Sequence, residues 1–139
     1  MRNTWAPTLF RCTAIALTVA ALGGCAANYP LAESNPEQSM VKVPGNAEST
    51  YRTILGFSKE FCYKLTTDAQ YYPAAKEGEI TLMVLANGGK IKTTFMSFDI
   101  KQDEAESAVT ITIRKGLHDL RDAGLSWAKG IAAPCPFPF

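Results

Sequence analysis

The turn sequence Asn87-Gly88-Gly89 constrains the fold of this chain more than any other feature. Two stretches with strand-like apolar patterns flank it, at residues 79–86 and 90–101. Asn and Gly tolerate the positive φ values of a tight hairpin turn, so this sequence predicts a connection between antiparallel strands. The first stretch is apolar at both odd and even positions, which indicates a central strand or one covered on both sides. An antiparallel sheet must therefore form around this hairpin.

The second strand of the hairpin changes phase near its middle. Phe95 lies at an odd position, whereas the apolar residues that follow it, up to Ile100, lie at even positions. Because side chains alternate strictly along a strand, this slip predicts a bulge or a strand whose ends pack on opposite faces. A third strand is expected over residues 108–115, where apolar and polar residues alternate cleanly.

Helical periodicity precedes and follows these strands. Apolar residues recur at helical spacing over 47–65, directly after Asn46, a residue type favoured as an N-cap. A second stripe covers 117–129 and ends at Gly130, a good C-terminal stop. Gly124 lies within this stripe although glycine costs about 1 kcal/mol of helix propensity. Its small size indicates a close contact between the second helix and the sheet.

The predicted element order is α-β-β-β-α, with residues 66–77 as a loop and 102–107 as an acidic turn. Each helix carries one apolar stripe, and both stripes are buried if the two helices lie on one face of the sheet. We predict an α+β two-layer sandwich with a three-stranded antiparallel sheet, as a single domain over 46–139. Residues 25–45 are rich in Asn, Pro and Ser without apolar periodicity, so a flexible tether is expected there.

The N-terminus combines positive charge with a short apolar run. Arg2 and Arg11 are its only charged residues, and Cys12–Leu22 is an apolar stretch of 11 residues. This length is too short to cross a bilayer and is typical of a signal-peptide core.

The run ends in Leu-Gly-Gly-Cys at Leu22–Cys25, which resembles the lipobox of small bacterial lipoproteins. The resemblance implies cleavage of a signal peptide at residues 1–24, a diacylglycerol on the Cys25 thiol and acylation of the new amino group. Because Ala26 and Ala27 follow instead of aspartate, similarity to lipoprotein sorting patterns implies an outer-membrane anchor facing the periplasm. The alternatives are an ordinary signal peptide with a stray cysteine and an uncleaved apolar N-terminus.

Four cysteines become two once the leader is removed and Cys25 is acylated. Cys62 and Cys135 remain, and an oxidising envelope compartment favours a disulfide between them. Two free thiols and a metal-binding pair are the alternatives, although a chain with one histidine cannot readily fill a four-ligand zinc site. We predict the disulfide, no metal and no cofactor.

Common catalytic motifs are missing from the sequence: there is no GxSxG, P-loop, HExxH, CxxC or GxGxxG pattern. One catalytic pairing stays open, with Cys62 as nucleophile and His118 as base, as in small envelope peptidases that resemble this chain in size and lipidation. However, Cys62 falls near the end of a predicted helix, where the dipole disfavours a thiolate. We expect His118 to be exposed beside Asp119 in the first turn of the second helix.

The net charge of +1 gives no sign of the clustered basic surface that nucleic-acid binding requires. We predict a non-catalytic envelope module, held to the membrane by its lipid, that binds a protein partner or supports envelope assembly. The alternatives are a small hydrolase using Cys62 and His118, and a lipid-anchored inhibitor of an exogenous enzyme. Tyr71 and Tyr72, together with the aromatic residues of the tail at 134–139, form a candidate binding patch.

Overall fold

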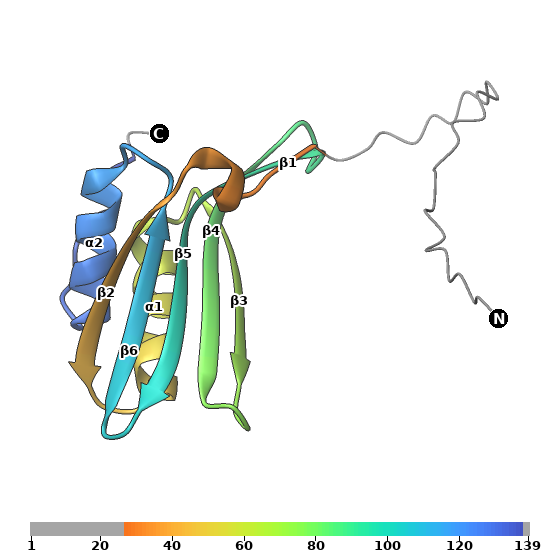
Figure 1. Ribbon diagram of the computed structural model, residues 1–139. Helices are drawn as coiled ribbons and strands as arrows, with labels where there is room; N and C mark the ends of the chain where they lie inside the picture. The colour runs from red at the N-terminus through yellow and green to blue at the C-terminus, as the bar shows by residue number, and fades with distance from the viewer. Residues whose placement is uncertain (1–26, 138–139) are drawn as a thin grey trace, which may run out of the picture.

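The predicted hairpin is present in the computed structural model, which describes residues 27–137 (Figure 1). Its turn joins β4 (Glu77–Ala86) to β5 (Ile91–Asp103). Asn87, Gly88 and Gly89 have φ values of 52°, 66° and 82°. A side chain with a Cβ atom is strained in this region unless it is Asn or Asp, so the turn sequence and the backbone agree.

Six strands, two α-helices and one short 3-10 helix make up the described chain. In order they are β1 (Ala27–Tyr29), η1 (Leu31–Ser34), β2 (Glu37–Pro44), α1 (Ala47–Phe61), β3 (Thr66–Tyr72), β4, β5, β6 (Glu106–Ile113) and α2 (His118–Ala128).

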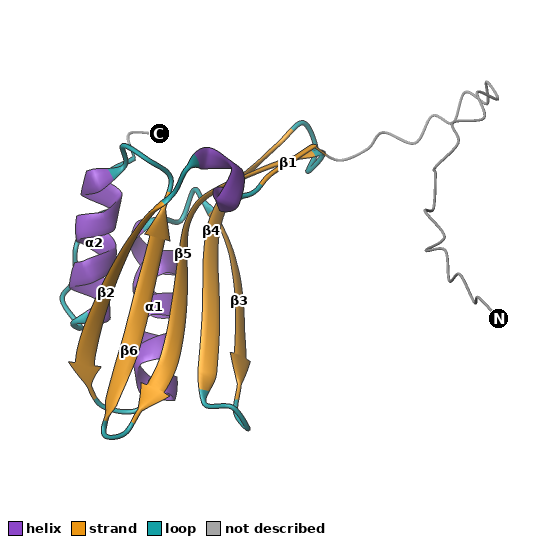
Figure 2. Ribbon diagram, in the orientation of Figure 1, coloured by secondary structure: helices purple, strands orange, loops and turns teal. Residues whose placement is uncertain are grey.

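The strands form one sheet in the order β2-β6-β5-β4-β3, and each neighbouring pair in this path is antiparallel. β1 adds to the sheet by pairing in parallel with the start of β5. α1 joins the two edge strands by crossing behind the sheet, and α2 packs on the same side (Figure 2). The fold is therefore the predicted α+β arrangement, with helices over a mostly antiparallel sheet.

The sheet is wider than predicted, with six strands instead of three. The expectation of a flexible tether over 25–45 is wrong for Glu37–Pro44, which forms the edge strand β2. The loop expected at 66–77 is wrong for Thr66–Tyr72, which forms the opposite edge strand β3. Both strands have few large apolar residues, because an edge strand is held largely by backbone hydrogen bonds to one neighbour. Hydrophobic periodicity therefore marks them weakly.

The core lies between the sheet and the two helices. β6 contributes Val109, Ile111 and Ile113, as its alternation predicts, and each is at most 1% exposed. Trp127 of α2 is fully buried, and its ring centroid lies 6.3 Å from that of Phe98 in β5. No helix among residues 27–137 is long and apolar enough to cross a membrane.

α1 begins as predicted and ends earlier. The Asn46 side chain accepts a hydrogen bond from the Ser49 amide at 2.8 Å, so Asn46 is the N-cap. The amide of Ala47 donates to Oε1 of Gln102 at 2.8 Å, which fixes the start of α1 against the β5–β6 turn. The helix ends at Phe61 instead of residue 65, because Cys62 leaves the helical conformation and forms the C-cap.

The predicted phase slip in β5 is a β-bulge. Leu82 of β4 pairs with Met96, whereas the next residue, Met83, pairs with Thr94. Phe95 therefore has no partner on β4, and its ring contacts that of Phe137 at a centroid distance of 5.3 Å. The extra residue switches which parity of β5 faces the helices, which explains the pattern in the sequence.

Glycine at position 78 is required by the packing of α1 on β4, and this predicts a destabilised variant. A Cβ atom added to Gly78 would lie 2.6 Å from Cδ2 of Tyr51, a side chain that is itself buried. Gly78→Ala is expected to lower the free energy of unfolding by about 1–3 kcal/mol in urea denaturation.

Gly56→Ala is the matched control for this substitution. No heavy atom lies within 4 Å of a Cβ added at Gly56, which is exposed on α1. Its greater helix propensity is expected to raise the free energy of unfolding by up to about 1 kcal/mol. Equal stability of the two variants would contradict the packing described for Gly78.

Candidate functional site

The predicted disulfide between Cys62 and Cys135 is present. It joins the C-cap of α1 to the tail that follows α2, across 73 residues of sequence, with a Cα–Cα distance of 5.2 Å. Cys62 is 3% exposed, so the bond closes over one end of the core. A disulfide sulfur carries no thiolate, and Cys62 therefore cannot act as a nucleophile in this state.

His118 is exposed at the first position of α2, as predicted. Its Nδ1 lies 3.5 Å from Oε2 of Glu37 and 3.4 Å from Nη1 of Arg121. Cys62 is bonded to Cys135 and His118 lies beside Glu37 and Arg121, so in this state the hydrolase hypothesis lacks its free thiol. The predicted lipid-attachment residue, Cys25, lies outside the described residues.

The aromatic residues considered as one patch are separated in the fold. Tyr71 packs its ring against Tyr51 beneath α1, at a centroid distance of 5.3 Å. Phe137 packs on Phe95, near the other end of the long strands. Tyr72 is 39% exposed but is paired with Glu77 at the far end of β4. The hypothesis of a single aromatic patch is therefore wrong for Tyr71, Tyr72 and Phe137, and Phe139 lies outside the described residues.

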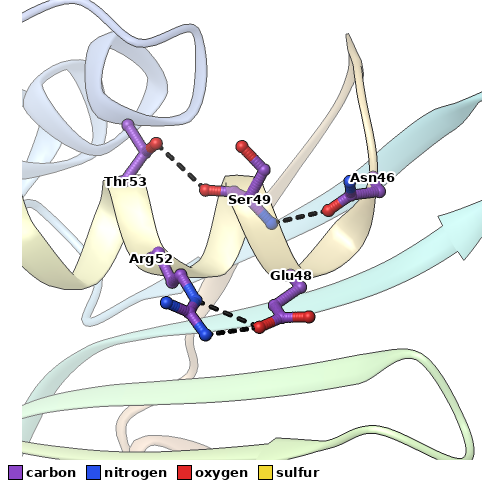
Figure 3. A pocket seen from close by; sticks show the side chains of 5 residues that line it. All are labelled: Asn46, Glu48, Ser49, Arg52 and Thr53. Atoms are coloured by element: carbon purple, nitrogen blue, oxygen red, sulfur yellow. Dashed lines mark hydrogen bonds and ion pairs between the residues drawn. The ribbon is translucent and has the colours of Figure 1, made fainter.

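A hollow of about 440 Å³ lies over the N-terminal turns of α1 (Figure 3). Its polar side chains bond to one another. Arg52 forms an ion pair with Glu48 at 2.6 Å, and Thr53 donates to the carbonyl of Ser49 at 3.0 Å. These groups stabilise the first turns of the helix and do not converge on a common point, so the hollow has no arrangement suited to catalysis.

A second hollow of about 340 Å³ lies where α2 begins and is lined partly by the tail. Leu117, Leu120 and Phe137 form its apolar part, and His118 and Asp119 form its polar rim. Within residues 27–137, no group of three or more His, Cys, Asp or Glu side chains could hold a metal ion. All buried side-chain nitrogen and oxygen atoms in the described region have hydrogen-bond partners.

The face of the sheet opposite the helices is the most extended candidate binding surface, and we call it the uncovered face (Figure 2). The pairing registers align its side chains in rows that cross all five long strands. Small and polar residues dominate these rows, whose members are Gln38, Thr112, Ser97, Thr81 and Asp68 in one, Met40, Thr110, Asp99, Glu79 and Gln70 in the next, and Lys42, Ala108, Lys101, Glu77 and Tyr72 in the third.

Three carboxylates on adjacent strands of the uncovered face lack cationic partners. Glu79 and Asp99 are directly opposite each other across β4 and β5, and Asp68 lies on β3. None of the three forms an ion pair within residues 27–137. Like charges directly opposite each other destabilise a sheet, by up to about 1 kcal/mol. The pair is therefore a local cost to the fold.

The lysines in the three rows of the uncovered face form ion pairs with carboxylates other than Glu79, Asp99 and Asp68. Lys101 lies 3.5 Å from Oε1 of Glu77, and Lys42 lies 2.6 Å from Oδ2 of Asp103. The hydrogen bond with Asp103 raises the pKa of Lys42 above its ordinary value, so this lysine stays charged. The centre of the face is left with a net negative charge. The strand alternation around Asp68 could have located part of this surface, but the weak apolar pattern of β3 concealed it.

No model of a known protein family matches the chain, and no curated protein matches it.

Proposed function

We propose that the protein is a lipid-anchored lipoprotein of the bacterial cell envelope, held through Cys25 in the outer membrane and facing the periplasm. Its domain is a non-catalytic module that binds a protein partner on the uncovered face. The membrane part of the proposal is supported by the leader and by the lipobox at Leu22–Cys25. The disulfide agrees with an oxidising compartment, where such bonds persist.

The observation that carries the binding proposal is the opposed carboxylate pair on the uncovered face. Glu79 and Asp99 are like charges directly opposite each other, and neither forms an ion pair within the described residues. A partner that brings lysine or arginine side chains to this position removes the repulsion and gains ion pairs. The partner expected is therefore a protein with a basic docking surface.

Site-specific photo-crosslinking in intact envelopes tests this proposal. A photoreactive residue replaces Thr110, which lies at the centre of the uncovered face opposite Asp99. The same residue at Lys59, exposed on α1, is the control on the helical face. A discrete crosslinked product is expected from position 110 and not from position 59. Equal products from both positions, or none from position 110, would contradict binding at this face.

A variant without the two carboxylate charges distinguishes a loss of binding from a loss of folding. Glu79→Gln with Asp99→Asn is expected to reduce the crosslink at position 110 strongly. The same change removes the repulsion and is expected to raise the free energy of unfolding by about 0.2–1 kcal/mol. Because the variant gains stability, a lost crosslink cannot be attributed to unfolding. An unchanged crosslink would show that the carboxylates do not recognise the partner.

A further inference from the structure

The position of β1 fixes where the lipid anchor meets the domain. Only Ala26 separates Cys25 from Ala27, the first residue of β1. Two residues of chain span at most about 7 Å. A lipid on Cys25 therefore leaves β1 no room to move away from the membrane surface, in contrast to the long tether expected from the sequence. This step rests on the lipid anchor of the proposed function.

β1 is held to the domain by its backbone and by an arginine. It pairs with the start of β5, with Ala27 opposite Ile91 and Tyr29 opposite Thr93. The Arg114 guanidinium donates to the Tyr29 carbonyl at 3.2 Å and to the Thr94 carbonyl at 3.0 Å. These bonds join β1, β5 and the end of β6. The anchored end of the chain is therefore fixed beside the β4–β5 hairpin (Figure 1).

The hairpin end has the composition of a membrane-contacting surface. We call residues 84–93 together with β1 the arm. Its only charged residues are Lys90 and Lys92, and both are exposed. Two of its large apolar side chains are also exposed, Leu85 at 42% and Tyr29 at 51%. Lysine, tyrosine and leucine together suit the boundary between lipid headgroups and acyl chains.

Charge is distributed asymmetrically along the sheet. The arm carries two lysines and no acidic residue, whereas the β5–β6 turn at the opposite end carries Asp103, which is paired with Lys42, together with Glu104 and Glu106. The thirteen residues of β5 separate these two ends by about 40 Å. An anionic lipid surface would therefore attract the arm, whose lysines have no acidic residue beside them in the arm sequence.

We infer that the arm docks on anionic phospholipid headgroups through Lys90, Lys92, Leu85 and Tyr29. The lipid on Cys25 keeps the arm close to the membrane surface. The two lysines then lie within a Debye length of the headgroups, and their attraction to the anionic lipid orients the domain. The sheet then stands away from the membrane with its acidic turn outermost. The uncovered face is thereby presented to the periplasm at a fixed orientation.

Tryptophan reporters in the full lipidated chain test this docking. Leu85→Trp places a reporter on the arm, and Ala105→Trp places one on the exposed turn at the opposite end. Each variant is reconstituted into phosphatidylcholine–phosphatidylglycerol vesicles with and without brominated lipid. Quenching by the bromine atoms is expected at position 85 and not at position 105. The fully buried Trp127 gives the same background in both.

A charge variant of the Leu85→Trp protein isolates the role of the lysines. Each lysine near an anionic surface contributes about fivefold to membrane affinity, so Lys90→Gln with Lys92→Gln is expected to lower the docked-to-undocked ratio by about 25-fold. Most of the quenching should therefore disappear. Lys76→Gln with Lys129→Gln removes the same charge at the other end of the molecule and should leave the quenching unchanged.

The outcomes separate this inference from the proposed function. Quenching confined to position 85, lost with the arm lysines, supports docking. If the protein stays bound to vesicles but position 85 is not quenched, or both positions are quenched equally, the inference is wrong and the lipid anchor stands. Equal quenching in vesicles of phosphatidylcholine alone would also overturn it. If the wild-type protein is not lipidated and does not bind vesicles, the proposed anchor and the docking both fail.

Discussion

Cys25→Ala is expected to release the protein from the membrane and to abolish its labelling by palmitate. One acyl chain gives only marginal, reversible binding, and two membrane signals are needed for stable anchoring. Losing a three-chain anchor should therefore reduce membrane affinity by at least about 10⁴-fold. Sedimentation of envelopes and metabolic labelling measure the two effects. Intact-mass analysis of the wild type should give a chain that begins at a lipid-modified Cys25.

Cys12→Ala is the matched control, because Cys12 lies within the predicted leader and is removed with it. This variant should sediment and incorporate label as the wild type does. A wild-type product that retains residues 1–24, or begins with an unmodified Cys25, would contradict the lipoprotein proposal. So would Cys25→Ala protein that still takes up palmitate.

The central part of the fold could be predicted from the sequence because its periodicities reflect burial. β4, β5 and β6 are buried against the helices, and their apolar residues repeat accordingly. Gly124 was predicted to mark a close helix–sheet contact, and a Cβ there would lie 3.2 Å from both Met96 Sδ and Phe98 Cζ. Elements that are buried by packing therefore show an apolar periodicity from which they can be predicted.

The outer strands β1 and β2 could not be predicted, because backbone hydrogen bonds to a neighbouring strand determine their position. β2 is joined to β6 over the full length from Glu37 to Pro44, but only Val41 and Val43 supply apolar side chains to the core side. β1 has three residues and is placed by its pairing with β5 and by Arg114. Neither interaction leaves a periodic pattern along the chain. The tether expected over 25–45 is therefore shorter, because β1, η1 and β2 lie within that range.

The same distinction applies to the candidate sites: one pairing could be predicted from the sequence and the other could not. The Cys62–Cys135 pairing followed from counting cysteines in an oxidising compartment, which requires no coordinates. The opposed pair Glu79 and Asp99 required the register between β4 and β5, which is set by the bulge at Phe95. The sequence contains the residues of the uncovered face, but only the pairing of the strands brings them together.

Cys135→Ser is expected to lower the free energy of unfolding by about 4 kcal/mol, because the disulfide closes a loop of 73 residues in sequence. Domains of this size have total stabilities of about 5–15 kcal/mol, so the melting temperature should fall by roughly 15–30 °C. Serine is placed at the half-buried position, which leaves Cys62 as a small apolar thiol in the core. The loss can then be attributed to the bond and not to a buried hydroxyl.

The bond also holds the tail on the core, so its removal should loosen two contacts of the tail. Nε1 of Trp127 donates to the Ala133 carbonyl at 2.9 Å, and Phe137 packs on Phe95. Dithiothreitol should lower the urea midpoint of the wild type to that of Cys135→Ser and leave the variant unchanged. Unreduced wild type should not react with iodoacetamide at Cys62. Alkylation there would mean that the thiol is free, and would restore the hydrolase alternative, because only a free Cys62 could act with His118.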